Sequence, residues 1–179
     1  TGTCFAFEQT GLQPDILCVS KGITGGFMPL SATLATETIF SSFLSKDMRS
    51  AFLHGHSYTA NPLACAAALK SWELLFSEGC QKRIQKINHI TQERLQAIAE
   101  NYDVNHVRQL GTIGAFDLTA QGDYFAKAVS SQFSKLALEQ GVLVRPLGPV
   151  IYTVPPYCTT EAELHQIYDA IEYVLKSDL

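Results

Sequence analysis

The chain has 179 residues, of which 46% are hydrophobic and only 17% are charged. This composition excludes a disordered or highly charged protein, and the length predicts one domain, or at most one and a half. The net charge is −4 and no basic stretch occurs, so a nucleic-acid-binding surface is not expected. The low share of charged residues favours a surface that is partly covered, for example by a partner subunit.

The five cysteines are widely spaced and form no C-x-x-C pair. This argues against a disulfide framework or a zinc module and favours a reducing, cytoplasmic compartment. No apolar stretch approaches the ~20 residues of a membrane span. Residues 1–5 have neither an initiator Met nor the features of a signal peptide. We therefore expect the chain to be part of a longer protein.

The first elements in chain order read as a sheet followed by a helix. The continuous apolar run at 16–19 predicts a strand buried on both faces, as in a parallel sheet covered by helices. A second strand is expected over 30–35. The Asn61-Pro62 pair is typical of a helix start. The following residues, 63–76, are apolar on nearly all sides, which predicts a buried helix that ends at Gly79.

The composition changes near residue 79, where polar and charged residues begin to separate apolar ones at helical spacing. An amphipathic connecting helix is expected over 81–100. Its predicted buried residues are Ile84, Ile87, Thr91, Leu95 and Ile98. Further strands are expected over 104–110, 112–118, 142–145 and 150–154. The predicted fold class is α/β: part of a parallel-sheet domain over 1–79, then a connecting helix and a small α+β domain over 80–179.

Two more helices are expected among these later strands. Phe125, Val129, Phe133 and Leu136 mark the first of them, and Gly141 is a typical C-terminal stop. Thr160 and Glu163 have the spacing of a capping box at the start of the second. The buried stripe expected on that last helix is Leu164, Ile167, Ile171, Val174 and Leu175.

Lys21 is the strongest candidate for chemistry. It directly follows the first predicted strand, and Gly25-Gly26 come soon after. Catalytic groups in open α/β sheets lie at the carboxyl ends of strands, where a partly desolvated lysine can form a Schiff base. The glycines would let the backbone approach a flat ligand closely. Judged by local pattern alone, a solvated lysine in a glycine-rich turn is the commoner situation.

The segment from His54 to Pro62 leads straight into a helix N-terminus, where hydroxyls and free N–H groups suit a phosphate. A polar loop in which Asn61 acts only as a cap is the alternative. A metal site at His54 and His56 is not expected, because no third ligand stands at a familiar spacing.

Arg145, at a predicted strand end before a proline, suits bidentate capture of a carboxylate. A surface arginine in a turn is the alternative reading. Asp117 has no neighbour in the sequence that would make it a catalytic acid.

Taken together and in order, these segments resemble the class III aminotransferases, pyridoxal phosphate enzymes of the type I fold. Residues 15–26 resemble the family's Schiff-base lysine segment, and residues 54–57 with 61–64 resemble its phosphate loop and following helix. The resemblance covers the whole chain, which corresponds to about the C-terminal two-fifths of the family's proteins. It implies the end of the large parallel-sheet domain over 1–79 and the small α+β C-terminal domain over 80–179.

The resemblance also implies roles for individual residues. Lys21 would hold pyridoxal 5'-phosphate through a Schiff base and later move a proton between the substrate and the cofactor. Ser57, where the family usually has Thr, would bind the phosphate together with the backbone of His56, where Pro is common. This loop would reach into the neighbouring subunit's site, which implies a homodimer. Gly55 would lie against substrate.

Within the family, residues 29–34 and 145–157 look most like the members that act in biotin biosynthesis. Those members move the amino group of S-adenosylmethionine to 8-amino-7-oxononanoate and give 7,8-diaminononanoate. Arg145 would bind the carboxylate of the oxononanoate, and Tyr152 would line the same end. The alternatives are another class III transaminase that acts on ω-amino acids, and a non-catalytic chain that needs a separate N-terminal chain.

The resemblance finally implies that part of the active site lies outside these residues. In the family, the aspartate that pairs with the pyridine nitrogen and the aromatic residue that stacks on the ring precede the position of Thr1. We therefore expect the 179 residues to be inactive alone.

Overall fold

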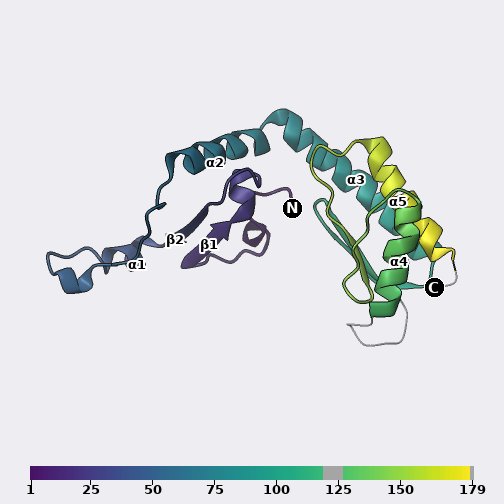
Figure 1. Cartoon of the computed structure of the whole chain (residues 1–179), viewed down its shortest axis with the longest axis horizontal. Coiled ribbons are helices and arrows are strands. Elements are labelled where there is room, and N and C mark those ends of the chain that lie inside the picture. The colour runs from purple at the N-terminus through teal and green to yellow at the C-terminus, as the bar shows by residue number, and fades with distance from the viewer. Residues whose placement is uncertain (119–126, 178–179) are drawn as a thin grey trace. The chain divides into compact units, whose positions relative to one another are not determined.

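A computed structural model describes residues 1–118 and 127–177 of the chain (Figure 1). It divides into two compact units, Phe5–Glu78 and a second formed by Thr1–Cys4 with Gly79–Leu179. Phe125, expected to mark the helix before Gly141, lies outside the described residues. No helix in the described ranges is both long enough and apolar enough to cross a membrane.

The Phe5–Glu78 unit contains a two-stranded sheet. β1 (Ile16–Ser20) and β2 (Ser31–Ala35) pair antiparallel, with Ile16 opposite Ala35. Both strands were predicted, and they pair antiparallel because residues 21–30 are too few for the crossover of a dozen or more residues that a parallel pair needs. The expected burial of β1 on both faces is wrong, since its residues alternate between exposed and half-buried. The shorter elements of the unit are η1 (Ala6–Gln9), η2 (Lys21–Thr24), α1 (Glu37–Ser41) and η3 (Met48–Ser50).

Helix α2 (Pro62–Leu75) begins as predicted, because the Asn61 side chain accepts hydrogen bonds from the N–H groups of Leu63 and Ala64 at 3.0 and 3.4 Å. The expected burial of this helix is wrong: only Ala64 is buried. A helix that is apolar on all sides needs cover on all sides, and within this unit η2 is the element that packs against it. The large exposed side chains are Leu63, Leu69, Trp72, Leu74 and Phe76.

The end of α2 was also predicted wrongly. Phe76 caps the helix, and Gly79 instead lies in the first turn of α3 (Glu78–Asn101). The turn at Ser77 separates the two helices without a glycine, since Phe76 and Ser77 can close it with backbone bonds to Trp72 and Leu74.

The described residues of the second unit form three helices and a three-stranded antiparallel sheet. The sheet has the order β3-β4-β5, formed by β3 (Val104–Leu110), β4 (Ile113–Leu118) and β5 (Val150–Thr153). α3, α4 (Lys127–Glu139) and α5 (Glu161–Leu175) lie along the same side of these strands (Figure 1). Residues 142–145 are not a strand. Val144 of that segment is buried in the core, but the segment has no ladder partner among the described residues.

The core of this unit contains side chains from the sheet and from all three helices. α3 buries all five residues predicted for it. Phe116 of β4, Phe133 of α4 and Tyr168 of α5 are each at most 1% exposed. Gly141 ends α4 with a φ of +79°, and the Thr160–Glu163 capping box opens α5, both as predicted. The predicted stripe on α5 is buried or packed against the core, and Tyr168, which the prediction omitted, lies at its centre.

Candidate functional site

Lys21 occupies an unusual backbone position at the end of a strand. It begins η2 directly after β1, and its φ is +51°. This left-handed conformation is unfavourable by about 1–2 kcal/mol for an ordinary L-residue, and such residues gather at functional sites. Its side chain is exposed, so the expected partial desolvation is wrong for this chain. No described element covers the lysine, which leaves the amino group accessible to a ligand.

Thr24 closes the turn that carries Lys21. Its side chain is 2% exposed, and its Oγ1 lies 2.5 Å from the carbonyl oxygen of Met28 and 3.3 Å from that of Lys21. Gly25 and Gly26, between these two carbonyls, have φ values of +62° and +80°. The glycines permit the tight reversal, and the threonine hydroxyl joins its two ends.

The same turn packs against α2. A Cβ atom placed on Gly25 would lie 3.3 Å from Ser71 Oγ of that helix, closer than most side chains tolerate. Glycine therefore lets η2 approach the helix closely. The segment that ends at Asn61, the cap of α2, runs directly into this helix, and the Lys21 turn packs against the same helix.

The segment before α2 is folded by its own polar groups. The N–H of His56 donates to Thr59 Oγ1 at 3.1 Å, and the N–H of Tyr58 donates to His56 Nδ1 at 3.1 Å. The carbonyl oxygen of His56 accepts from the N–H of Thr59 at 3.0 Å. The His56 N–H, expected to share a phosphate with Ser57, is therefore already bonded within the chain.

Other donors of this segment are free to bind an anion. The N–H groups of Gly55, Ser57 and Ala60, and the Ser57 hydroxyl, have no partner among the described residues. Ala60 has a φ of +56°, a second non-glycine residue in the left-handed region. Unpaired N–H groups before a helix are a typical phosphate site. An accessible amine and this set of donors fit a cofactor that carries an aldehyde and a phosphate.

Arg145 and Tyr152 are related by a tight turn in the second unit. Leu147 and Val150 exchange two backbone hydrogen bonds of 2.9 and 3.0 Å. Arg145 and Tyr152 each lie two residues outward from this pair, and both are exposed, whereas the adjoining Val144 is buried. An exposed guanidinium and an exposed phenol on either side of one turn are groups suited to a carboxylate.

The predicted site residues divide between the two units. Arg145 and Tyr152 belong to the unit of Gly79–Leu179. The unit Phe5–Glu78 carries the others, Lys21, Gly55, His56 and Ser57. Within the described ranges, no three His, Cys, Asp or Glu side chains are grouped so as to hold a metal ion.

One polar cluster was missed from the sequence. His106 has a φ of +48° at an irregularity of β3, and its Nδ1 lies 2.9 Å from Asp117 Oδ2 on β4. The Arg108 guanidinium donates to Asp117 Oδ1 at 2.8 Å. Burial raises the pKa of Asp117, but the bonds from Arg108 and His106 outweigh it and hold the pKa below its ordinary 3.8.

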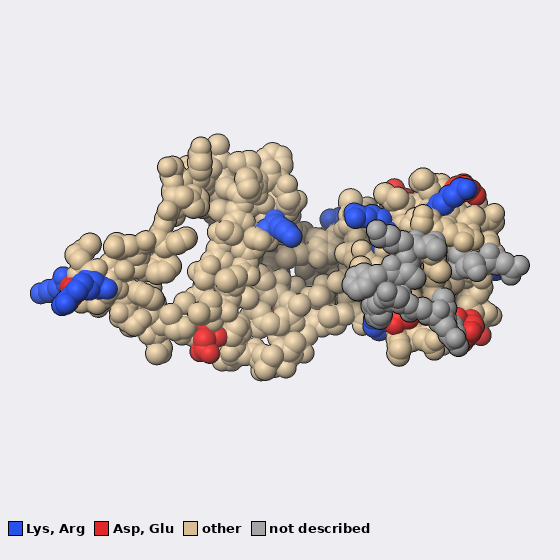
Figure 2. All heavy atoms as spheres, turned by 60° about the horizontal axis from the view of Figure 1, so that its bottom comes forward, with Lys and Arg blue, Asp and Glu red and all other residues tan. Residues whose placement is uncertain are grey.

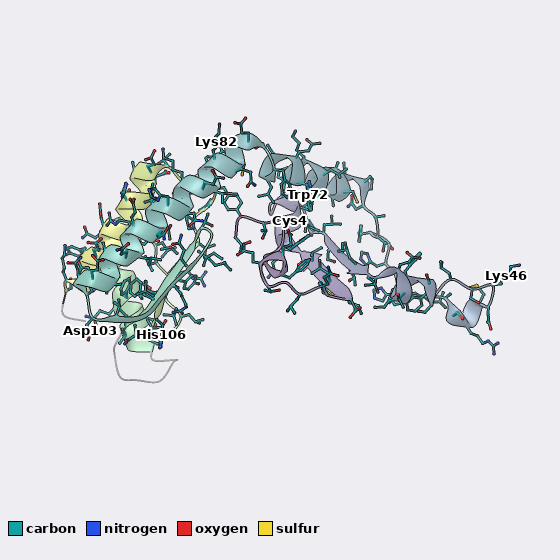
Figure 3. The ribbon with its side chains drawn as sticks, turned by 180° about the vertical axis from the view of Figure 1, so that it is seen from behind. Cys4, Lys46, Trp72, Lys82, Asp103 and His106 are labelled. Carbon is teal, nitrogen blue, oxygen red and sulfur yellow. The ribbon has the colours of Figure 1, made fainter. Side chains whose placement is uncertain are left out.

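Asp117 thus has partners in Arg108 and His106, and a carboxylate that they hold ionised is no proton donor. The strand irregularity that brings His106 alongside (labelled in Figure 3) has no sequence signal, because no glycine marks the left-handed residue.

Comparisons with known proteins agree over nearly the whole chain. Residues 1–175 match the family Aminotransferase class-III. The adenosylmethionine-8-amino-7-oxononanoate aminotransferase of Synechococcus elongatus is 43% identical over 98% of this chain and 41% of its own length. The enzyme of the same name from Aquifex aeolicus is 38% identical over 98% of this chain and 40% of its own length.

Solved structures extend this agreement to the fold. The adenosylmethionine-8-amino-7-oxononanoate aminotransferase of Methanocaldococcus jannaschii aligns with a TM-score of 0.84 at 33% identity, over 100% of this chain and 43% of that one. An amine transaminase from an uncultivated Pseudomonas species, in its PLP-bound (internal aldimine) form, aligns with a TM-score of 0.85 at 33% identity, over 97% of this chain and 41% of that one.

The chain thus spans about two-fifths of the length of these relatives. The predicted fold class, an α/β chain that forms the C-terminal part of this transferase fold, is confirmed. The chain belongs to the class III aminotransferase family.

Proposed function

We propose that the protein containing this chain is a pyridoxal-phosphate-dependent aminotransferase. It moves the amino group of S-adenosylmethionine to 8-amino-7-oxononanoate and gives 7,8-diaminononanoate. The observation that carries the proposal is Lys21, an accessible amine held in a left-handed conformation at the end of β1. The choice of substrates is supported by the names of relatives that are 43% and 38% identical to this chain.

In this proposal the cofactor supplies an electron-withdrawing ring that stabilises negative charge developing on the substrate carbon. The Nζ of Lys21 would hold the cofactor through its aldehyde, and as a free amine it would carry the proton that the reaction moves. The Ser57 hydroxyl and N–H bind the phosphate of the cofactor in the neighbouring subunit's site, and His56 shapes the loop that presents them. Gly55 leaves room for substrate beside this loop.

Arg145 provides the charge that binds the carboxylate of the oxononanoate, and Tyr152, exposed on the other side of the same turn, lines that end of the site. We further propose that the enzyme is a cytoplasmic homodimer. The many exposed apolar side chains of residues 5–78 support this part, because they need cover that the described chain does not provide.

The first test is the replacement of Lys21 by alanine in the intact protein. The visible absorbance band of bound pyridoxal phosphate should disappear, because only the amine can bond the aldehyde. Lys46→Ala and Lys70→Ala alter the other two lysines of residues 5–78 and should leave the band unchanged. A dialysis-resistant band in Lys21→Ala would contradict the proposal.

The second test concerns the substrates. The intact protein should transfer the amino group of S-adenosylmethionine in preference to that of an ω-amino acid. Arg145→Ala should raise the KM for 8-amino-7-oxononanoate by roughly 10- to 100-fold, the equivalent of a lost hydrogen bond to a charged group. Activity with ω-amino acids alone would favour the other class III transaminases, of which an (S)-enantioselective ω-transaminase from Thermomicrobium roseum is 27% identical to this chain.

A further inference from the structure

We propose that Thr24 is a positioning residue, whose hydroxyl fixes the direction in which the Lys21 side chain leaves β1. The proposal rests on the proposed role of Lys21. It assigns to Thr24 no contact with substrate or cofactor, only control of the backbone that carries the reacting amine.

The first observation is the burial of Thr24. Among residues 5–78, all of which the structure describes, Thr24 and Ala64 are the only buried residues. A polar side chain in such a position is unfavourable unless it makes hydrogen bonds. The hydroxyl of Thr24 donates to the carbonyl oxygen of Met28 at 2.5 Å, with the carbonyl oxygen of Lys21 second at 3.3 Å.

The second observation is the strain in the segment that this hydroxyl closes. Lys21, Gly25 and Gly26 all have positive φ values, and Lys21 is the only one of the three with a side chain. The strain of one left-handed residue is comparable with the contribution of one hydrogen bond. Without the bond between the two ends of the turn, Lys21 can therefore relax to a negative φ, which would redirect its side chain.

The third observation is that one side of the turn is already fixed. The close approach of Gly25 to Ser71 holds the middle of the turn against α2. This contact restrains the turn as a body, but it leaves the conformation of Lys21 undetermined. The hydroxyl of Thr24 is the group that joins the strand end at Lys21 to the carbonyl at Met28, from which the chain continues into β2.

The test compares variants of the intact, cofactor-loaded protein. Thr24→Val keeps the shape of the side chain and removes the hydroxyl, whereas Thr24→Ser keeps the hydroxyl. Thr36→Val is the matched control, because Thr36 Oγ1 is buried with no hydrogen-bond partner in the described chain. The readouts are kcat, the KM for the amino donor, and the pH midpoint of the change in the visible absorbance of the bound cofactor.

Thr24→Val should lower kcat by roughly 10- to 100-fold, the effect of a small misplacement of a reacting group, while KM changes by less than about twofold. The pH midpoint of the visible band should shift, since that band reports the amine's attachment rather than turnover. Thr24→Ser should restore both properties to near wild type, and Thr36→Val should change neither. If Thr24→Val does not fold, Thr24→Ala is measured in its place with the same expectation.

Two results would overturn the inference while the proposed function stands: wild-type kcat and pH midpoint in Thr24→Val, or an equal loss in Thr24→Ser. Either result counts against the inference alone only if Lys21→Ala has lost the visible band. If Lys21→Ala keeps the band, the proposed function itself fails, and the inference fails with it.

Discussion

The two units of the chain differ in how they treat their apolar residues. Residues 79–177 bury Phe116, Phe133 and Tyr168 almost completely, around a sheet covered by helices. Residues 5–78 bury only Ala64 and Thr24, although they hold many large apolar side chains. The difference shows that apolar content does not by itself create a core. The unit that carries Lys21 needs other parts of the intact protein to cover it.

The unit without a core also carries few charged side chains. Residues 5–78 contain only ten charged side chains, and Figure 2 shows the uncharged surface that results, with basic groups gathered at one tip. Lys46, labelled in Figure 3, lies at that tip. Large uncharged apolar surfaces are rare on free monomers and mark sites of association. The ten residues are Glu8, Asp15, Lys21, Glu37, Lys46, Asp47, Arg49, Lys70, Glu73 and Glu78.

The largest expected effect comes from separating the units. A fragment of residues 79–179 should unfold cooperatively on heating, because it contains its own core, whereas a fragment of residues 5–78 should show no cooperative transition. Circular dichroism during heating measures both. A sharp transition in the 5–78 fragment would show that its apolar side chains find a core among themselves.

Next in size are matched phenylalanine substitutions in the 179-residue chain. Phe133 is 0% exposed and Phe27 is 83% exposed. Phe133→Ala should lower the free energy of unfolding by about 3–5 kcal/mol, and Phe27→Ala should change it by less than about 0.5 kcal/mol. Denaturant titration gives both values. Similar losses in the two variants would remove the contrast between the units.

A glycine pair tests the packing more finely. A Cβ on Gly114 would lie 2.9–3.0 Å from Thr91, Leu95 and Tyr168, whereas a Cβ on Gly22 would meet nothing within 4 Å. Gly114→Ala should lower the free energy of unfolding by about 1–3 kcal/mol through overpacking, and Gly22→Ala should not lower it measurably. The melting temperatures of the two variants check this, and a neutral Gly114→Ala would mean that the core can yield.

Helix caps should matter only where the helix belongs to a cooperative core. Thr160→Ala removes the cap of α5 and should lower the free energy of unfolding by about 1 kcal/mol, whereas Asn61→Ala removes that of α2, in the unit without a core, and should change it by less than about 0.5 kcal/mol. Denaturant titration of the 179-residue chain measures the two changes. An Asn61→Ala as costly as Thr160→Ala would indicate that α2 unfolds together with the core.

The smallest expected effect is a pH dependence on the β3–β4 pair. The pKa of Asp117 is lower in the folded chain than its ordinary 3.8, so its pairing with Arg108 and His106 stabilises the fold above about pH 4. That contribution should be lost as the pH falls through the lowered value. The stability difference between wild type and Asp117→Asn should therefore shrink below pH 4. A difference that grows there would mean that the ionised carboxylate destabilises the folded chain.

Local signals predicted well what local interactions decide. The Asn61 cap, the Thr160–Glu163 box and the stop at Gly141 depend on neighbours within a few residues, and all three are present. The burial of β1 and of α2 depends on which segments lie alongside, and the apolar runs at 16–19 and 63–76 carry no such information.

In the candidate site, too, local features could be predicted from the sequence, and features that depend on contacts between segments could not. Lys21 could be selected from its place after a strand, and Ser57 from its place before a helix start. The left-handed φ of Lys21, by contrast, arises where β1 runs into a turn closed by Thr24, and the pairing of His106 with Asp117 needs the register of two strands.

The conformation of Lys21 has a consequence for variants of this protein. Glycine adopts positive φ freely, so Lys21→Gly should be more stable than Lys21→Ala by about 1 kcal/mol. A variant library screened only for folding would therefore enrich glycine at this position, whereas a screen for amino transfer would retain lysine alone. Comparing the two enrichments would separate what the chain needs in order to fold from what it needs in order to react.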